Sequence, residues 1–172
     1  MPTVSMELGG RTLTIETGRV ARQASGSVLV RYGDTVVLCT AVVSRRETDR
    51  DFLPLLVDYR EKTYAAGRIP GGFFKREGRP TEKEILSSRL IDRSLRPLFD
   101  QSNRYDTMIG AEVLSHDQLN DGDTLGLIGG SCALNLSDLP FPGPVGAMRL
   151  GLGPDGFLIN PTAEEVEFSR MN

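Results

Sequence analysis

The chain has 172 residues, of which 39% are hydrophobic and 25% charged, and a formal net charge of −3. This length suits one domain with a packed core, and the composition excludes wholesale disorder. No apolar run approaches the roughly 20 residues of a membrane span, and no secretory signal is visible. Cys39 and Cys132 lack CxxC spacing, so we expect reduced, buried thiols in a cytosolic protein.

Positive and negative side chains are segregated along the sequence. Residues 68–96 hold eight basic and four acidic side chains, whereas residues 97–172 hold three basic and eleven acidic ones. The overall negative charge argues against a nucleic-acid partner, but a local basic stretch still attracts phosphates. A solvated charged face is the alternative interpretation of this stretch.

The first sixty residues have the patterns of β-strands. Residues 11–17 alternate polar and apolar side chains, and turn residues separate residues 27–31 from the β-branched stretch 35–43. We therefore predict a hairpin whose second strand is buried on both faces. A charged loop over residues 45–51 and a short strand over residues 53–59 follow.

A loop rich in glycine and proline over residues 67–80 precedes a helix with a well-defined start. Thr81 and Glu84 match a capping box, and Pro97 ends the helix near Arg96. On a helical wheel the apolar residues share one broad side: Leu86, Leu90, Ile91, Leu95 and Leu98. The arginines lie roughly opposite, within about 60° of one another: Arg89, Arg93 and Arg96. Asp92 is a candidate partner for this repelling group.

The remaining residues predict another strand and helix and a terminal hairpin. Residues 107–115 form a strand, and residues 125–136 a helix whose many glycines favour close packing against a sheet or partner. Residues 145–152 and 156–159 form a strand pair. This order of elements predicts an α+β domain with helices on a mixed sheet.

The sequence offers little catalytic chemistry of its own. The single histidine, His116, cannot build a histidine metal site, and we expect a structural or surface role for it. No nucleophile elbow, P-loop or dinucleotide fingerprint is present. The acidic run 117–123 lacks the spacing of a calcium loop, so we interpret it as a turn and helix cap. We predict no catalytic residue and no metal ligand in this chain.

The tetrapeptide Phe73-Phe74-Lys75-Arg76 combines two aromatic rings with two cations on the glycine-rich loop. Exposed rings stack on unpaired bases while cations hold phosphates, which is how single-strand binders work. Burial of the rings as an anchor is the alternative. Further arginines nearby favour RNA or single-stranded nucleic acid as the partner: Arg79, Arg89, Arg93 and Arg96.

Two long motifs give the chain a resemblance to a known family. Residues 64–80 (YAAGRIPGGFFKREGRP) and 88–99 (SRLIDRSLRPLF) are similar to polynucleotide phosphorylases, in the first of their two ribonuclease PH-like core domains. Residues 139–147 and 160–162 extend the resemblance over essentially the whole chain. The implied fold is ribonuclease PH-like (ribosomal protein S5 domain 2-like), with a mixed sheet and packed helices.

The resemblance implies a cytoplasmic, phosphorolytic 3′-to-5′ exoribonuclease that uses inorganic phosphate and Mg²⁺ to degrade single-stranded RNA to nucleoside diphosphates. It implies a homotrimeric ring around a channel, whose constriction is lined by the aromatic-basic loop. The residues expected to bind RNA are then Phe73, Phe74, Lys75 and Arg76, although many members have arginine at the position of Lys75. Phosphate contact falls on the other arginines: Arg79, Arg89, Arg93 and Arg96.

The resemblance also implies what these 172 residues lack. The family's phosphate and metal sites lie in a second core domain, followed by a helical linker and by KH and S1 domains. Where active domains carry a small-residue-plus-arginine phosphate motif, Gly122-Asp123-Thr124-Leu125 stands here, and Asp123 would repel phosphate. We therefore expect a domain truncated before its final strand and helix, and inactive alone. A stand-alone RNA-binding or assembly subunit of an exosome-like ring is the alternative.

Overall fold

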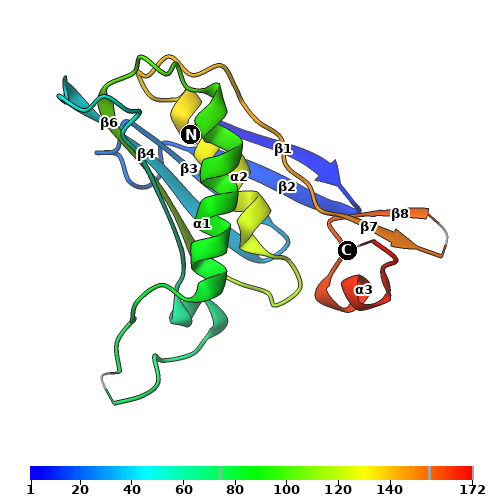
Figure 1. Cartoon of the computed structure of the whole chain (residues 1–172). Helices are drawn as coiled ribbons and strands as arrows, with labels where there is room; N and C mark the ends of the chain where they lie inside the picture. Colours follow the sequence, from blue (N-terminus) through cyan, green and yellow to red (C-terminus); the bar gives the residue numbers. More distant parts are fainter. Residues whose placement is uncertain (74, 155, 172) are drawn as a thin grey trace.

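The computed structural model describes residues 1–73, 75–154 and 156–171. A six-stranded sheet carries two helices on one face, and a two-stranded sheet lies beside it (Figure 1). The strands are β1 (Thr3–Leu8), β2 (Arg11–Thr17), β3 (Gly26–Tyr32), β4 (Thr35–Glu47), β5 (Leu55–Glu61), β6 (Tyr105–Ser115), β7 (Leu150–Gly153) and β8 (Gly156–Ile159). The helices are α1 (Glu82–Leu95), α2 (Gly122–Asn135) and α3 (Ala163–Phe168), with the 3-10 helices η1 (Thr63–Ala66) and η2 (Arg96–Leu98).

The large sheet is mixed, in the order β1-β2-β3-β4-β6-β5. Strands β1 to β4 form an antiparallel meander, and β4 pairs antiparallel with β6. The pair β5 and β6 is parallel and therefore needs a crossover connection, which contains α1. The predicted α+β class and the predicted hairpin between β3 and β4 are both confirmed.

The core lies between this sheet and the two helices. Helix α2 is apolar on nearly all sides because it packs on β3 and β4 and against α1. Its glycines allow the close approach: a Cβ on Gly129 would overlap the Cys39 sulfur and lie 2.8 Å from the Val30 side chain. Cys39 is buried and Cys132 is half-buried, and both are free thiols. Burial raises the pKa of the Cys39 thiol.

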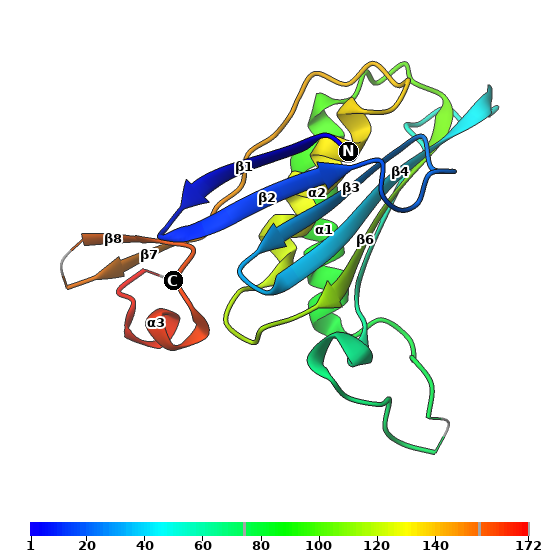
Figure 2. The ribbon, with the colours of Figure 1, turned by 180° about the vertical axis from the view of Figure 1, so that it is seen from behind.

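The opposite face of the sheet corrects one sequence prediction. Strand β4 was expected to be buried on both faces, but its burial alternates: Val37 and Cys39 are fully buried, whereas Leu38 is half-buried and Val42 is 48% exposed. The reason is that α1 and α2 cover the same face, and none of the described elements covers the other (Figure 2).

Helix α1 begins as predicted and also closes one edge of the sheet. The capping box of Thr81 and Glu84 is present. Glu84 also accepts a bond from the Glu61 backbone N–H at 2.8 Å, and the Ser88 hydroxyl oxygen accepts one from the Tyr59 N–H at 2.9 Å. Both donors belong to the edge strand β5, so α1 occupies groups that would otherwise template another strand.

The predicted apolar side of α1 is too broad. Ile91 and Leu95 are fully buried, as expected. Leu86 is 57% exposed and Leu90 is 46% exposed, because they lie on the side of the helix that faces away from the core. A wheel places these residues at neighbouring angles, but only the packing of α1 on β5 and α2 decides which angles are covered.

Several element boundaries also differ from the sequence prediction. Strand β4 continues to Glu47, which pairs with Tyr105, so the charged loop starts later than predicted. Helix α2 starts at Gly122 instead of residue 125, and β5 at Leu55 instead of residue 53. Strand β7 is shorter than the predicted 145–152 because its partner β8 has four residues. Strand β1 and helix α3 were not predicted.

Candidate nucleic-acid interface

The loop over residues 67–80 projects from the body of the domain next to the N-terminal end of α1 (Figures 1 and 2). It leaves after η1, where Gly67 takes a left-handed conformation with φ of 67°, and it returns at Thr81, the N-cap of α1. The sheet edge and the helix start therefore fix its two ends, while its middle extends away from the core.

The tip of the loop presents the predicted aromatic and basic side chains. Phe73 is 95% exposed, which contradicts the anchor alternative for this ring. Lys75 and Arg76 are exposed as well, and the chain turns at Gly72 and Lys75, both of which have positive φ. Phe74 lies outside the described residues. An exposed ring beside two cations has the chemistry to stack on a base and hold its phosphate.

A groove of about 480 Å³ separates the loop from the end of the sheet. Its sheet side is lined by Arg60, paired with Asp58 at 3.0 Å, and by Lys62, which pairs with Glu112 at 3.4 Å. Its loop side is lined by two arginines, Arg76 and Arg79, which make no ion pair with any described residue. Five carboxylates also line the groove: Asp58, Glu61, Glu77, Glu84 and Glu112. Because Arg76 and Arg79 pair with none of them, an anion that binds here would contact these two arginines.

Glu77 fastens the loop to η1. Its carboxylate accepts hydrogen bonds from the Thr63 backbone N–H at 2.8 Å and from the Thr63 hydroxyl at 3.1 Å. Sequence reasoning missed this pair, since no short-range pattern connects residues fourteen positions apart.

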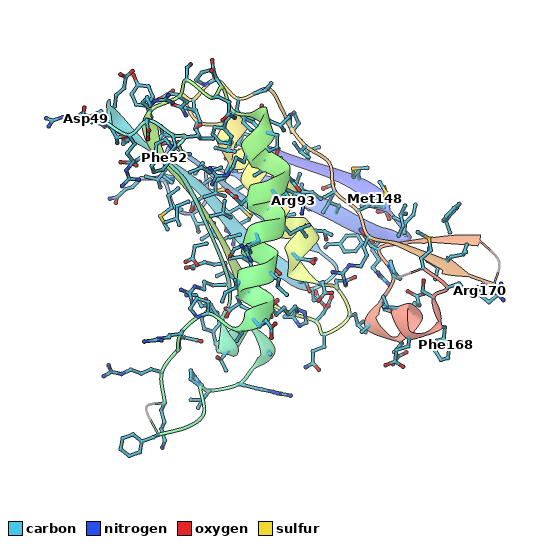
Figure 3. The ribbon with its side chains drawn as sticks, viewed as in Figure 1. Asp49, Phe52, Arg93, Met148, Phe168 and Arg170 are labelled. Carbon is cyan, nitrogen blue, oxygen red and sulfur yellow. The ribbon has the colours of Figure 1, made fainter. Side chains whose placement is uncertain are left out.

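The three arginines of the helix have different surroundings. Arg89 and Arg93 are exposed on α1 and form no ion pair among the described residues. Figure 3 labels Arg93 on this helix. Arg96 donates to Asp92, the predicted partner, at 2.7 Å and to the Leu55 carbonyl at 3.0 Å. These contacts tie the end of α1 to β5. Both bonds give Arg96 a structural role. Contact between Arg96 and an RNA phosphate stays a prediction.

The arginines and the loop tip are well separated along the helix. At 1.5 Å per residue, Arg93 lies about 16 Å beyond the first residue of α1. An RNA strand therefore has to extend over several nucleotides to contact both the loop and Arg93. The structure exposes Phe73, Lys75, Arg76 and Arg79 on one loop, and it exposes Arg89 and Arg93 on α1.

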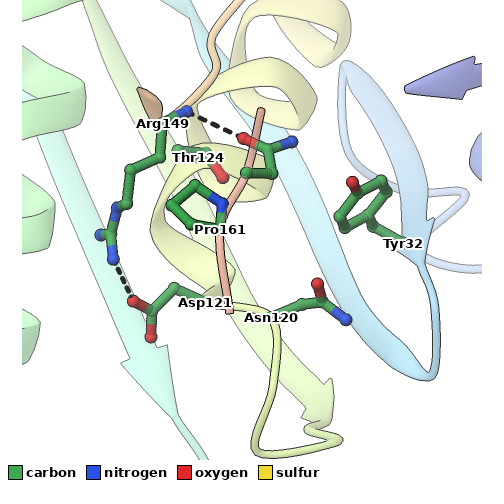
Figure 4. A pocket seen from close by; sticks show the side chains of 7 residues that line it. Tyr32, Asn120, Asp121, Thr124, Arg149 and Pro161 are labelled. Atoms are coloured by element: carbon green, nitrogen blue, oxygen red, sulfur yellow. Dashed lines mark hydrogen bonds and ion pairs between the residues drawn. The ribbon is translucent and has the colours of Figure 1, made fainter. Parts of the chain in front are cut away.

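The N-terminus of α2, a kind of position where anions often bind, is occupied by the chain's own carboxylates. Arg149 pairs with Asp121 (Figure 4). It also pairs with the buried Asp123 at 2.7 Å, and Lys83 reaches Asp121 at 3.2 Å. Burial raises the pKa of Asp121, but Lys83 and Arg149 outweigh it and hold that pKa below its usual value. An inorganic phosphate would meet two anions here. The sequence did not indicate the role of Arg149.

Among the described residues, His, Cys, Asp and Glu side chains form no group of three or more that could hold a metal ion. His116 instead shapes a turn, because its Nδ1 accepts the Gln118 backbone N–H at 3.1 Å. Nor does any helix among the described residues combine the length and apolar character needed to cross a membrane.

The family model described as the 3′ exoribonuclease family, domain 1, matches residues 9–140. The chain belongs to this family. Members similar to it include the polyribonucleotide nucleotidyltransferases of Heliobacterium modesticaldum, 60% identical over 173 residues, and of Hyphomonas neptunium, 56% identical over 171 residues. The matches cover 100% and 99% of this chain but 24% of each relative. The chain thus spans about a quarter of their length.

The crystal structure of rice (Oryza sativa) Rrp46 supports the fold assignment. It matches with a TM-score of 0.71 and 16% identity, over 95% of this chain and 71% of that one. Identity this low speaks for the fold alone. With the family match, it confirms the predicted ribonuclease PH-like fold, and the curated relatives confirm the resemblance to polynucleotide phosphorylases.

Proposed function

We propose that this domain grips single-stranded RNA for a cytoplasmic phosphorolytic 3′-to-5′ exoribonuclease, a polyribonucleotide nucleotidyltransferase that takes part in mRNA turnover. In the reaction, an oxygen of inorganic phosphate attacks the last phosphodiester of the RNA. A nucleoside diphosphate leaves, and the shortened RNA regains a free 3′-hydroxyl. The domain's part in this reaction is binding: it holds the strand upstream of the bond that breaks.

The observation that carries the proposal is the exposed loop tip, where Phe73, Lys75 and Arg76 project together from the body of the domain. A ring stacks on any base, and a cation pairs with any phosphate, so such a tip binds RNA without sequence preference. That suits an enzyme that moves along RNA of every sequence. Phe74 is part of the same proposal through its neighbours in the sequence.

The chemical step is assigned to a second core domain outside this chain. A helical linker and KH and S1 domains complete the proposed enzyme. One feature supports this division: the carboxylates of Asp121 and Asp123 occupy the N-terminus of α2. We propose that Mg²⁺ and inorganic phosphate bind to the rest of the enzyme.

A homotrimeric ring is the proposed assembly, and α1 offers surface for it. Its outer side exposes Ile85, Leu86 and Leu90, side chains that are 46–57% accessible. Exposed apolar residues grouped on one helix face mark an interaction surface. We propose that Leu86 and Leu90 contact another part of the enzyme ring, whereas Arg89 and Arg93, exposed on the same helix, stay accessible to RNA.

The test compares long and short RNA in the intact enzyme. Phe73→Ala/Phe74→Ala removes the stacking surface, and each lost base stack costs about 1–3 kcal/mol. Processive degradation of long RNA should fall by about tenfold or more, while RNA too short to reach the loop should be degraded nearly as before. Degradation rates on labelled RNAs of both lengths measure this.

The matched control is Phe157→Ala, which removes a ring that is 72% exposed on β8, away from the loop. It should leave both rates unchanged. An equal loss on long and short RNA in the loop variant would refute the clamp role.

A further inference from the structure

Both ends of the loop are hydrogen-bonded to one residue, Thr63. The Thr63 carbonyl accepts the backbone N–H of Arg68 at 3.2 Å, on the outgoing strand of the loop. Its own N–H and hydroxyl donate to the two carboxylate oxygens of Glu77 at 2.8 and 3.1 Å, on the returning strand. Residues 68 and 77 therefore meet at η1 and form a closed neck, with the aromatic-basic tip between them.

Thr63 is a firm point for this neck. It belongs to η1, where the Ala65 carbonyl accepts the His116 backbone N–H at 3.0 Å, just beyond the end of β6. The preceding residue, Lys62, pairs with Glu112 of β6 at 3.4 Å. The neck is thus tied to β6, the strand next to the edge strand β5.

We propose that Glu77 is a positioning residue, which closes the neck of loop 67–80 on Thr63 and so holds the tip ready for RNA. The inference rests on the RNA role of the loop proposed above. Glu77 itself acts through the tip residues and touches Thr63, not the RNA.

Burial does little to order this loop. Between residues 68 and 77, every described side chain is exposed except Pro70, which is half-buried. Gly71 and Gly72 add backbone freedom, since glycine loses the most conformational entropy when it is fixed. If the neck were open, the loop would lose this conformational entropy when RNA binds, and the affinity for RNA would be weaker. If the neck is closed, part of the entropy is already lost in the free protein, so RNA binding costs less.

The charge of Glu77 makes the proposal sharply testable. A carboxylate next to Arg76 in a polyanion site repels phosphates, so its removal should tighten RNA binding if charge alone matters. If the carboxylate holds the neck, its removal should weaken binding instead. The two explanations predict opposite signs for one substitution.

The experiment measures binding of a fluorescent single-stranded oligouridylate to the intact protein, without inorganic phosphate, by anisotropy. Glu77→Ala should weaken binding about fivefold, because the competent loop conformation becomes a minor one. Thr63→Val removes only the hydroxyl bond and should weaken it about twofold, whereas Thr63→Ser should restore it. The double variant should bind no more weakly than Glu77→Ala alone.

Glu82→Ala is the matched control. Glu82 is an exposed carboxylate in the first turn of α1, and its side chain makes no hydrogen bond or ion pair with the described residues. Its removal changes the charge equally but leaves the neck intact, so binding should stay the same or tighten. Equal or tighter binding by Glu77→Ala as well would overturn the positioning role.

A second readout needs no RNA. Trypsin cleaves after Lys75 and Arg76, which are exposed in the loop, but not after Arg79, which Pro80 follows. An opened neck should make cleavage several-fold faster in Glu77→Ala than in Glu82→Ala, with the thermal melting of both unchanged. Equal cleavage rates would overturn the closed neck.

The same assays separate this inference from the proposed function. Phe73→Ala/Lys75→Ala removes tip side chains but keeps the neck, so it should weaken RNA binding without faster trypsin cleavage. If this variant binds RNA normally, the RNA role of the loop fails, while the cleavage assay still decides whether Glu77 closes the neck.

Discussion

Chemically identical side chains on one helix perform different tasks in this domain. Arg89 and Arg96 are seven positions apart, and the sequence assigned both to phosphate contact. The structure exposes Arg89 to solvent, whereas Arg96 donates to Asp92 and to the Leu55 carbonyl. A helical wheel cannot distinguish them, because the partners of Arg96 include a backbone carbonyl of β5.

We expect Arg96→Ala to lower the free energy of unfolding by about 1–2 kcal/mol, since charge-assisted bonds from a half-exposed guanidinium are lost. Arg89→Ala should change it by less than about 0.5 kcal/mol but should weaken RNA binding. Urea unfolding and RNA titration of both variants measure this. Unchanged stability with weakened RNA binding in Arg96→Ala would instead assign Arg96 to phosphate contact.

At the scale of elements, the main feature is how closely α2 approaches the sheet. The sequence predicted such packing from the glycines of the helix, and the structure confirms it at Gly129, above Cys39 and Val30. The number of glycines in α2 predicted that another element packs closely against this helix. Which strands do so followed only from the sheet order, in which β3 and β4 lie beneath α2.

Gly129→Ala tests this packing against helix propensity. Alanine favours a helix by about 1 kcal/mol over glycine, but overpacking typically costs about 1–3 kcal/mol. Because the new Cβ would overlap the Cys39 sulfur, we expect a net loss of unfolding free energy. Gly146→Ala, where nothing lies within 4 Å of the added Cβ, should be nearly neutral. A stabilised Gly129→Ala protein, in urea unfolding, would contradict the tight contact.

At the scale of the whole molecule, the proposed division of labour separates RNA grip from chemistry. We expect the 172-residue chain alone to release no nucleoside diphosphate from RNA in the presence of phosphate, while the intact enzyme does. Chromatographic detection of diphosphates decides this, with circular dichroism to verify that the chain is folded. Measurable phosphate-dependent turnover by the folded chain would refute the division.

The alternative of a stand-alone RNA-binding or assembly subunit predicts a different molecule. The mass of the subunit in its native source discriminates between the two. A subunit of 18.8 kDa, the mass of this chain, would favour the assembly subunit, and one about four times larger would favour the enzyme.

The family, the α+β class, the capping box of α1 and the aromatic-basic loop could all be predicted from the sequence, because they depend on residues close together in the chain. The covered leucines of α1, the open face of β4 and the partners of Arg96, Arg149 and Glu77 became known from the folded structure. Each of those depends on groups brought together from distant positions. Local pattern predicts local geometry, but partners across the fold are set by the packing of elements.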